Sequence, residues 1–326
     1  MTGAAPEDLR LNLLTHWLDE VLPGHDAPRP ASSDASFRRY FRVFCDDQPW
    51  IVMDAPPEQE DCRPFVAVSA ALSRAGVRVP TVHAQDLSHG FLLLDDLGRD
   101  TLLARLSGID ANAAYRAAID MLVRIQQAEA QDLPPYDEAL LRREMSLFKD
   151  WYIGVHRQQC WNASQQAAWD RVVDQLCRAA LAQPRVFVHR DYHSRNLMWP
   201  GDGAVGVLDF QDAVHGPISY DLVSLLRDCY VAWPVDQQAA WLAYYHQQAS
   251  AAGLPVADLA SLRRDLDWMG VQRHLKAVGI FARLNHRDGK ANYLDDIPRT
   301  LTYLRDVSAV YPELAFLHDT AAACLS

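Results

Sequence analysis

The feature that most constrains the fold is an ordered set of polar residues that follows two short apolar runs. Val186-Phe187-Val188 leads into His189-Arg190-Asp191-Tyr192-His193-Ser194-Arg195-Asn196, and Val205-Gly206-Val207 leads into Leu208-Asp209. The set supplies an aspartate, then an asparagine, and then a second aspartate after the next apolar run. Phosphoryl transfer in a kinase-type fold uses these parts at this spacing.

Each of the three residues suits a distinct role. Asp191 would act as general base and would orient the attacking hydroxyl. Asn196 cannot titrate, and its amide oxygen is a suitable hard ligand for Mg²⁺. Asp209 would bring the same ion to the β- and γ-phosphates. A polar loop can contain any one of these residues by chance, but the ordered set after two strand-like runs favours catalysis.

Composition excludes several other classes of protein. The chain has 326 residues, which is enough for two lobes with separate cores. Its net charge of -11 argues against nucleic-acid binding, which needs a dominant basic surface. No apolar run is long enough to span a bilayer, and the N-terminus lacks the pattern of a signal peptide. The six cysteines are scattered without a C-x-x-C pair, so we expect reduced thiols in a cytoplasmic protein. We also expect the chain to act as a monomer.

The apolar periodicity predicts a small strand-rich lobe before a larger helical lobe. A helix is expected over Leu9–Leu22, two strands within Ser36–Ala55 around a turn at Asp46–Pro49, a helix near Arg63–Ala75, and a buried strand at Gly90–Leu94. From Leu102 onward the period is helical, except near 186–210. We therefore expect an α+β protein with an N-lobe at 1–97 and a C-lobe at 98–326.

The catalytic segment resembles that of the aminoglycoside phosphotransferase and choline kinase superfamily. The matching residues are His189-x-Asp191-x-His193-x-x-Asn196, Leu208-Asp209-Phe210 and Gly216-Pro217-x-x-Tyr220-Asp221-Leu222. The resemblance implies a two-lobed, protein-kinase-like fold that uses ATP and Mg²⁺. It also implies that Asp221 caps a helix and braces the catalytic loop, and we expect His193 to support the loop structurally.

In the segments expected to bind the nucleotide, the chain departs from the pattern of this superfamily. Leu92–Gly98 resembles the interlobe hinge, so backbone groups from Asp95 to Leu97 would contact adenine. Met53 stands where these kinases place a lysine that grips phosphates. The expected phosphate loop, residues 31–42, contains no glycine, although Ser33 and Ser36 can line phosphates.

The arginines of this loop can replace the missing cation. Alternation along a strand places Arg38, Tyr40 and Arg42 on one face, and Arg39 and Phe41 on the other. We assign Arg38 and Arg42 to the nucleotide site, and the sequence leaves open which of the loop's arginines reaches the phosphates.

A narrower resemblance concerns the substrate. Asp34–Arg42, Met53–Glu58 and Gln272–Leu284 are similar to a subfamily of cell-wall-recycling kinases that phosphorylate the C1 hydroxyl of N-acetylmuramate and N-acetylglucosamine. In a helix from residue 272 onward, Arg273, Lys276 and Arg283 share one face, which would suit an anionic amino sugar. A solvated helix face is the alternative interpretation.

Other functions remain open at this point. The chain could be a related kinase for an aminoglycoside, choline or another alcohol. The absent lysine and glycines also fit a nucleotide-binding pseudokinase, although Asp191, Asn196 and Asp209 argue against it. A protein kinase ranks last, because the chain contains no G-x-G-x-x-G or A-P-E segment.

Overall fold

The computed structural model describes residues 8–33 and 37–326. The described chain forms two compact units: residues up to Arg99 with Gly206–Gln211, and Asp100–Val205 with Asp212–Ser326. The first unit is rich in strands and the second is mainly helical, which confirms the predicted α+β class. The segment that carries Asp209 belongs to the first unit, although it lies within the catalytic half of the sequence.

The first unit contains a five-stranded antiparallel sheet with the order β1-β2-β3-β5-β4. Its strands are β1 (Arg29–Ser33), β2 (Arg39–Cys45), β3 (Gln48–Asp54), β4 (Val82–Asp86) and β5 (Phe91–Asp95). The strands β2, β3 and β5 confirm the prediction, whereas β1 and β4 were not predicted. The turn between β2 and β3 is also tighter than expected. Asp46 and Asp47 alone form it, with φ of 49° and 63°, and Gln48 and Pro49 already belong to β3.

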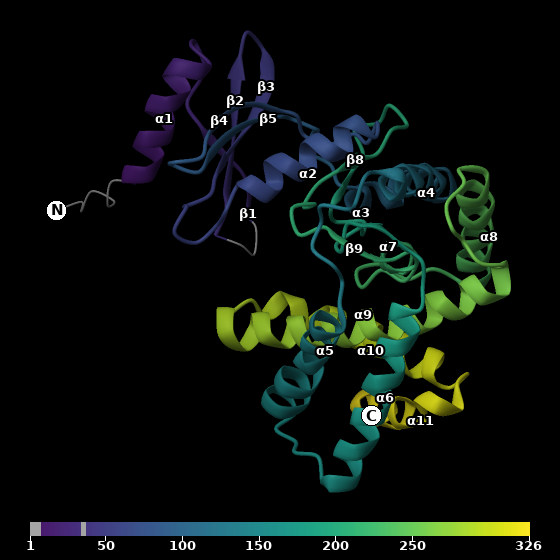
Figure 1. Cartoon of the computed structure of the whole chain (residues 1–326). Coiled ribbons are helices and arrows are strands. Elements are labelled where there is room, and N and C mark those ends of the chain that lie inside the picture. The colour runs from purple at the N-terminus through teal and green to yellow at the C-terminus, as the bar shows by residue number, and fades with distance from the viewer. Residues whose placement is uncertain (1–7, 34–36) are drawn as a thin grey trace. The chain divides into compact units, whose positions relative to one another are not determined.

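Helix α1 (Leu9–Val21) covers one face of this sheet, as Figure 1 shows. It begins at Asp8, whose carboxylate accepts a hydrogen bond from Leu11 N, and it ends before Pro23. Its buried residues Leu14 and Leu18 pack against a set of apolar strand residues: Phe41, Val43, Val52, Phe91 and Leu93. Burial of each leucine side chain contributes about 1.5–3 kcal/mol, so α1 is held by packing against the sheet.

The segment Gly206–Gln211 joins the first unit through α2 (Arg63–Arg74) and the loop after it. The Phe210 ring, which is fully buried, lies 4.7 Å from the Phe65 ring of α2. The backbone N–H of Val207, in β8 (Gly206–Val207), donates to Arg78 O at 2.8 Å. These contacts place the neighbouring Asp209 in the strand-rich unit.

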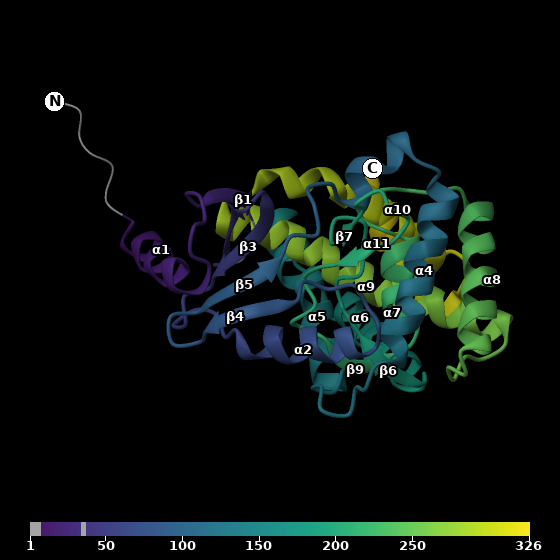
Figure 2. The same ribbon diagram turned by 90° about the horizontal axis from the view of Figure 1, so that it is seen from above.

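The second unit is built around α9 (Leu259–Asp288), a helix of 30 residues that crosses the unit in Figures 1 and 2. The helices that pack on it include α5 (Glu138–Leu147), η2 (Phe148–His156), α6 (Ala163–Leu181), α7 (Tyr220–Leu226) and α10 (Ile297–Ser308). The other helices are α3 (Leu102–Arg105), η1 (Leu106–Gly108), α4 (Ala111–Gln127), α8 (Val235–Ala251), η3 (Ala291–Asp296), η4 (Pro312–Leu314) and α11 (Ala315–Leu325). Gly279 of α9 lies so close to Leu147, the last residue of α5, that an added Cβ would lie 2.3 Å from the carbonyl carbon of Leu147. The element η2 is π-helical, a rare geometry that is frequent near functional sites.

A short pair of strands in the second unit positions the catalytic loop. β6 (Arg185–Val188) pairs antiparallel with β9 (Val214–Pro217), and β7 (Leu197–Met198) follows the loop. The loop 189–196 therefore begins where a buried strand ends, as the apolar run Val186–Val188 predicted.

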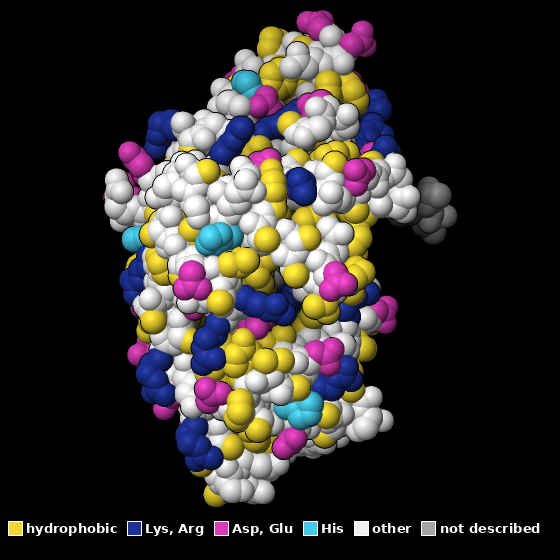
Figure 3. All heavy atoms as spheres, turned by 90° about the vertical axis from the view of Figure 1, so that its right-hand side faces the viewer, with side chains coloured by type: hydrophobic (Ala, Val, Ile, Leu, Met, Phe, Trp, Pro, Cys, Tyr) yellow, Lys and Arg dark blue, Asp and Glu magenta, His cyan; other side chains and the backbone are white. Residues whose placement is uncertain are grey.

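Among the described helices, none is long and apolar enough to cross a bilayer. On the face drawn in Figure 3, basic, acidic and apolar side chains are interspersed.

Candidate active site

A buried aspartate of α7 holds the start of the catalytic loop. Asp221 accepts hydrogen bonds from the backbone N–H groups of His189, at 2.6 Å, and Arg190, at 3.0 Å. Its side chain is fully buried in the first turn of α7. Burial raises the pKa of Asp221 to about 7, against the opposing effect of the two N–H donors. The conformation of residues 189–190 is thus fixed by Asp221 of α7, the residue that the sequence assigned to a brace. The expected helix cap is wrong for α7, because its N-cap residue is Ser219 and Asp221 lies within the first turn.

A second aspartate, not predicted from the sequence, holds the end of the same loop. Asp228 is fully buried and accepts hydrogen bonds from both the backbone N–H and the hydroxyl of Ser194, at 2.9 and 2.6 Å. Its other oxygen accepts from Tyr230 N at 2.9 Å. Asp191 therefore lies in a segment whose two ends are each held by a carboxylate: residues 189–190 by Asp221, and Ser194 by Asp228.

The aromatic residues of the loop point into the second unit. The Tyr192 hydroxyl donates to Ala118 O of α4 at 2.7 Å, and the ring is fully buried. His193 is also buried, and its ring meets the Tyr230 ring edge-on at 5.1 Å. Burial lowers the pKa of His193, so its imidazole is neutral near pH 7. Its Nδ1 has no hydrogen-bond partner within the described residues.

Asp191 is half-buried and remains ionised. Burial alone would raise its pKa, but the positive charges of Lys276, Arg190 and Arg273 outweigh this effect and lower the pKa to about 2. A carboxylate with so low a pKa is a weak base, because it binds a proton poorly at neutral pH. It is a good hydrogen-bond acceptor, however, and can orient a hydroxyl group.

Arg190, which precedes Asp191, adopts an unusual backbone conformation. Its φ is 77°, in the left-handed region that residues other than glycine rarely enter. Its guanidinium pairs with Glu144 of α5 at 2.5 Å and donates to Asp212 O at 3.3 Å. The strained conformation of Arg190 is stabilised by the hydrogen bond of its backbone N–H to Asp221 and by the contacts of its guanidinium.

Glu144 is the centre of a buried polar network that sequence reasoning missed. Besides Arg190, it contacts Lys276 of α9 at 3.3 Å, Gln272 of α9 at 3.2 Å and the Tyr136 hydroxyl. Burial would raise the pKa of Glu144, but Lys276 and Arg190 outweigh it and lower the pKa. No local pattern on α5 distinguishes Glu144 from other helix glutamates, because its partners are distant in sequence.

The basic residues of α9 are not a solvated stripe. Arg273 and Lys276 are buried, with exposures of 5% and 7%. Lys276 also contacts the Tyr220 hydroxyl at 3.1 Å, so its ammonium group is committed to Glu144 and Tyr220. The structure therefore gives the Lys276 ammonium group two buried protein partners. The direct contact of Lys276 with substrate that the sequence suggested stays a prediction.

Arg273 and Arg283 of α9 are the two arginines that the sequence assigned to substrate binding. Arg273 donates to the Cys229 sulfur at 3.5 Å, a weak contact for a guanidinium, and its charge helps to lower the pKa of Asp191. Arg283 is half-buried, and burial lowers its pKa. Both residues have a buried Nε without a partner within the described chain.

The two predicted metal ligands have suitable chemistry. The Asn196 amide nitrogen donates to Asp191 O at 3.0 Å, so its amide oxygen is the atom that can coordinate a cation. Asp209, in the strand-rich unit, has a φ of 63° and accepts from Gln211 Nε2 at 2.7 Å. Both are hard oxygen donors, as Mg²⁺ requires. In the described ranges no group of three or more His, Cys, Asp or Glu side chains suits a metal ion.

The predicted hinge residues lie at the end of β5 and directly after it. Asp95 is tied to the start of β4: its N–H donates to Thr81 O at 3.2 Å, and its carboxylate accepts from Thr81 N and His83. These hydrogen bonds outweigh the effect of burial and lower the pKa of Asp95. Leu97 is half-exposed after this point. The Asp95 N–H is thus already bonded to protein.

The predicted phosphate-binding residues are only partly described. Ser33 ends β1, and Ser36 lies outside the described residues. Arg38 pairs with Glu60 at 2.9 Å, and Arg42 pairs with Asp96 through two nitrogens. The structure thus gives each of these arginines a carboxylate partner.

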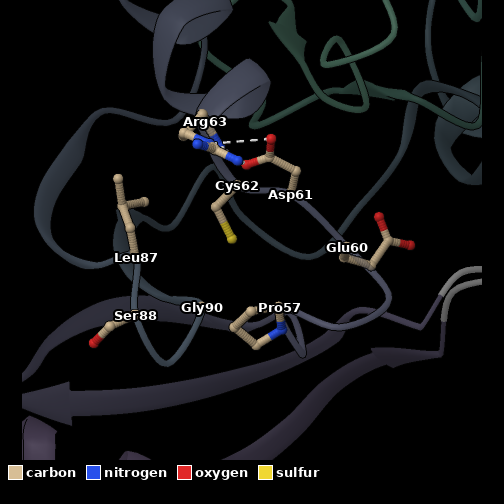
Figure 4. A pocket seen from close by; sticks show the side chains of 8 residues that line it. All are labelled: Pro57, Glu60, Asp61, Cys62, Arg63, Leu87, Ser88 and Gly90. Carbon is tan, nitrogen blue, oxygen red and sulfur yellow. Dashed lines mark hydrogen bonds and ion pairs between the residues drawn. The ribbon is translucent and has the colours of Figure 1, made fainter.

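A cavity of about 380 Å³ lies in the first unit at the start of α2, as Figure 4 shows. It is lined by Pro57, Glu60, Asp61, Cys62, Arg63, Leu87, Ser88 and Gly90. Arg63 pairs with Asp61 at 2.9 Å, and burial raises the pKa of the Cys62 thiol, which makes it unreactive. None of the predicted site residues lines this cavity.

A strand-rich unit, a helical unit and a braced H-x-D-x-H-x-x-N loop define a kinase-like small-molecule phosphotransferase. The model of the phosphotransferase enzyme family matches residues 28–264, and the chain belongs to that family. It is therefore an enzyme that transfers a phosphoryl group, and membership implies ATP as donor.

Relatives and solved structures agree with this family. The chain is 49% identical to an N-acetylmuramate/N-acetylglucosamine kinase of Pseudomonas putida, with 97% of this chain and 96% of the relative covered. It is 50% identical to the protein of the same name in Pseudomonas aeruginosa, covering 97% of each. The fold is similar to that of the gentamicin–APH(2")-IIa complex, with a TM-score of 0.63 and 13% identity over 91% of this chain and 97% of that chain. The fold is also similar to that of choline kinase LicA from Streptococcus pneumoniae, with a TM-score of 0.63 and 12% identity over 90% of this chain and 97% of that chain. The predicted resemblance to both groups is confirmed.

Proposed function

We propose that this kinase phosphorylates the C1 hydroxyl of N-acetylmuramate and N-acetylglucosamine, with ATP as donor. The observation that carries the proposal is the identity of about 50% over nearly the whole chain to two kinases named for these sugars. The product, a sugar 1-phosphate, suits direct conversion to a UDP-sugar during cell-wall recycling in the cytoplasm.

Asp191 has the properties that this reaction needs. Its carboxylate, ionised at neutral pH, accepts a hydrogen bond from the C1 hydroxyl and orients the oxygen toward the γ-phosphorus. A bond then forms between the C1 oxygen and this phosphorus, the bond to the β–γ bridging oxygen breaks, and the hydroxyl proton passes to Asp191. A hemiacetal hydroxyl is more acidic than an ordinary alcohol, so the low pKa of Asp191 is compatible with this role.

The remaining residues of the site bind and orient. Asn196 and Asp209 fit Mg²⁺ as oxygen donors, and the ion would neutralise charge on the nucleotide phosphates when bound. Backbone groups between Asp95 and Leu97 would bind adenine. The segment from Ser33 to Ser36, with Arg38 or Arg42, would bind the phosphates.

The sugar site would use the arginines of α9. Arg273 is near enough to Asp191 to lower its pKa, and its buried guanidinium donates to the Cys229 sulfur. An arginine in this state gains more from a carboxylate or hydroxyl ligand than a solvated one does. Arg273 and Arg283 would therefore favour an anionic amino sugar over a polycationic aminoglycoside.

The proposal is tested by ADP release with a panel of acceptors. N-Acetylmuramate and N-acetylglucosamine should support turnover, and the product should lose its reducing end because C1 carries the phosphate. Kanamycin and choline serve as controls for the related kinases. Turnover only with these controls, or a product that keeps its reducing end, would contradict the proposal.

A further inference from the structure

The catalytic loop carries an arginine that neither the chemistry nor the metal site uses. Arg195 follows Asp191 by four residues and directly precedes Asn196. We propose that Arg195 binds the lactyl carboxylate of N-acetylmuramate and so distinguishes this sugar from N-acetylglucosamine, which has no lactyl group. This inference rests on the proposed function, for which it names a specificity residue, and it concerns only residues of the helical unit.

Arg195 is held in place by aromatic rings. Its guanidinium carbon lies 3.7 Å from the centre of the Tyr230 ring, between α7 and α8, and 5.9 Å from that of Tyr293 in η3. Stacking of this kind uses the flat face of a guanidinium, whereas the N–H donors lie in its plane and point past the ring edges. Stacking thus fixes the arginine without using the donors that recognise a carboxylate.

The carboxylate beside Arg195 has a closer partner. Asp296 lies 3.8 Å from Arg195 Nη2, which is farther than a hydrogen bond reaches. Arg299 donates to Asp296 at 3.1 Å and to Cys229 O at 2.6 Å. Arg195 is therefore the second cation on one carboxylate. A carboxylate of the substrate could form the bidentate pair with Arg195 that Asp296 does not form at this distance.

Arg195 is also accessible, which distinguishes it from Arg273 of α9. The Arg195 side chain is 40% exposed, whereas Arg273 is 5% exposed and donates to the Cys229 sulfur. A substrate that arrives from solvent can therefore reach the Arg195 guanidinium without displacing a buried contact. Arg195 adds a direct contact for the anionic group to the charges that α9 supplies.

The place of Arg195 in the loop suits the shape of the sugar. The lactyl group stands on C3, two ring atoms from the C1 hydroxyl, so its carboxylate needs a cation close to Asp191 but separate from it. The Tyr230 ring that carries Arg195 also meets the His193 ring edge-on at 5.1 Å. His193 is two residues from Asp191, so the stacked arginine lies next to the catalytic segment.

Asp228 fixes Arg195 and its aromatic support together. Its carboxylate accepts from the backbone N–H and hydroxyl of Ser194 through one oxygen, and from Tyr230 N through the other. Ser194 directly precedes Arg195, so one buried side chain positions both the backbone at the arginine and the ring on which it stacks. Such preorganisation lowers the entropy cost of binding an anion.

The test compares acceptors that differ in the lactyl group. The ADP-release assay gives kcat/KM of the full chain, Arg195→Met and Arg195→Lys for N-acetylmuramate, its carboxyl methyl ester and N-acetylglucosamine. Arg195→Met should lower kcat/KM for N-acetylmuramate about 10- to 100-fold more than for N-acetylglucosamine, mainly through KM, because one charge-assisted pair is lost. Arg195→Lys should recover part of this loss, since it keeps the charge but not the planar fork. The ester keeps the size of the lactyl group without its charge, so its loss should resemble that of N-acetylglucosamine.

Arg116→Met is the matched control. Arg116 of α4 is exposed and stacks on the Tyr244 ring of α8, with its guanidinium carbon 4.7 Å from the ring centre. The variant therefore removes a stacked, exposed arginine elsewhere in the same unit. It should change kcat/KM for both sugars by less than about 2-fold, as expected of a surface substitution.

The outcomes are distinct. Equal losses for both sugars in Arg195→Met indicate that Arg195 only supports the loop, and they overturn the proposal. A loss for the ester as large as that for the free acid shows that the carboxylate is not the contact and also overturns it. If the unaltered protein phosphorylates neither sugar, the proposed function fails and this inference with it, whereas the first two results refute this inference alone.

Discussion

Replacing Glu144 by glutamine should destabilise the helical unit strongly. The amide keeps the size of the side chain but removes the negative charge between Arg190 and Lys276, which lie 2.5 and 3.3 Å away. Loss of one partner from a buried ion pair costs about 3–5 kcal/mol, since the other charge stays buried without compensation. For a unit of roughly 220 residues and an unfolding entropy of about 2.1 cal/mol/K per residue, 4 kcal/mol lowers Tm by about 9 °C.

Differential scanning calorimetry measures this change, and the same helix supplies a control. Glu138 of α5 pairs with Arg142 at the surface, where Glu138→Gln should cost less than about 0.5 kcal/mol. Adding Lys276→Met to Glu144→Gln should recover part of the loss, because it removes one of the uncompensated cations. A Tm for Glu144→Gln as high as that of Glu138→Gln would refute the view that the network carries a large electrostatic energy.

Three further changes address the loop, a buried histidine and the helix packing. Asp191→Ala should lower kcat at least about 100-fold while ADP binding is retained, and near-normal turnover would remove Asp191 from the chemistry. Burial lowers the pKa of His274 from 6.5 to about 3, so the unfolded chain gains a proton first as the pH falls below 6.5 and stability is lost. Between pH 6.5 and 5 the free energy of unfolding of the unaltered protein should fall by about 2 kcal/mol more than that of the His274→Gln variant. Urea titrations measure both values, and equal decreases would exclude this role of His274. Gly279→Ala places a methyl group 2.3 Å from the Leu147 carbonyl carbon and should cost about 1–3 kcal/mol. Gly154→Ala, whose nearest contact would be an ordinary 3.4 Å, is the control, and equal Tm values for both variants would contradict the packing argument.

The sequence predicted the strands with strong apolar content and the loop with the ordered polar set. It did not predict β1 and β4, because both strands are short and mostly polar. Arg29–Ser33 shows no apolar alternation, and in Val82–Asp86 the alternation rests on Val82 and Ala84 alone. Both segments form strands because their backbones pair with β2 and β5, which the sequence pattern of the segments themselves does not show.

The candidate site was predictable only where its residues are close in sequence. Asp191 and Asn196 belong to one loop, and their spacing is informative by itself. Glu144 and Lys276 are 132 residues apart, and their contact depends on how α5 packs on α9. The helical wheel of α9 placed Arg273 and Lys276 on one face correctly, but it could not show that this face is buried.

The central claim is that the phosphate is transferred to the anomeric hydroxyl. The most direct test compares free N-acetylmuramate with its methyl glycoside, which differs only at C1, in the ADP-release assay. The free sugar should be turned over and the glycoside should not, although the glycoside should still compete for the site. Phosphorylation of the methyl glycoside would place the reaction at another hydroxyl and would contradict the account.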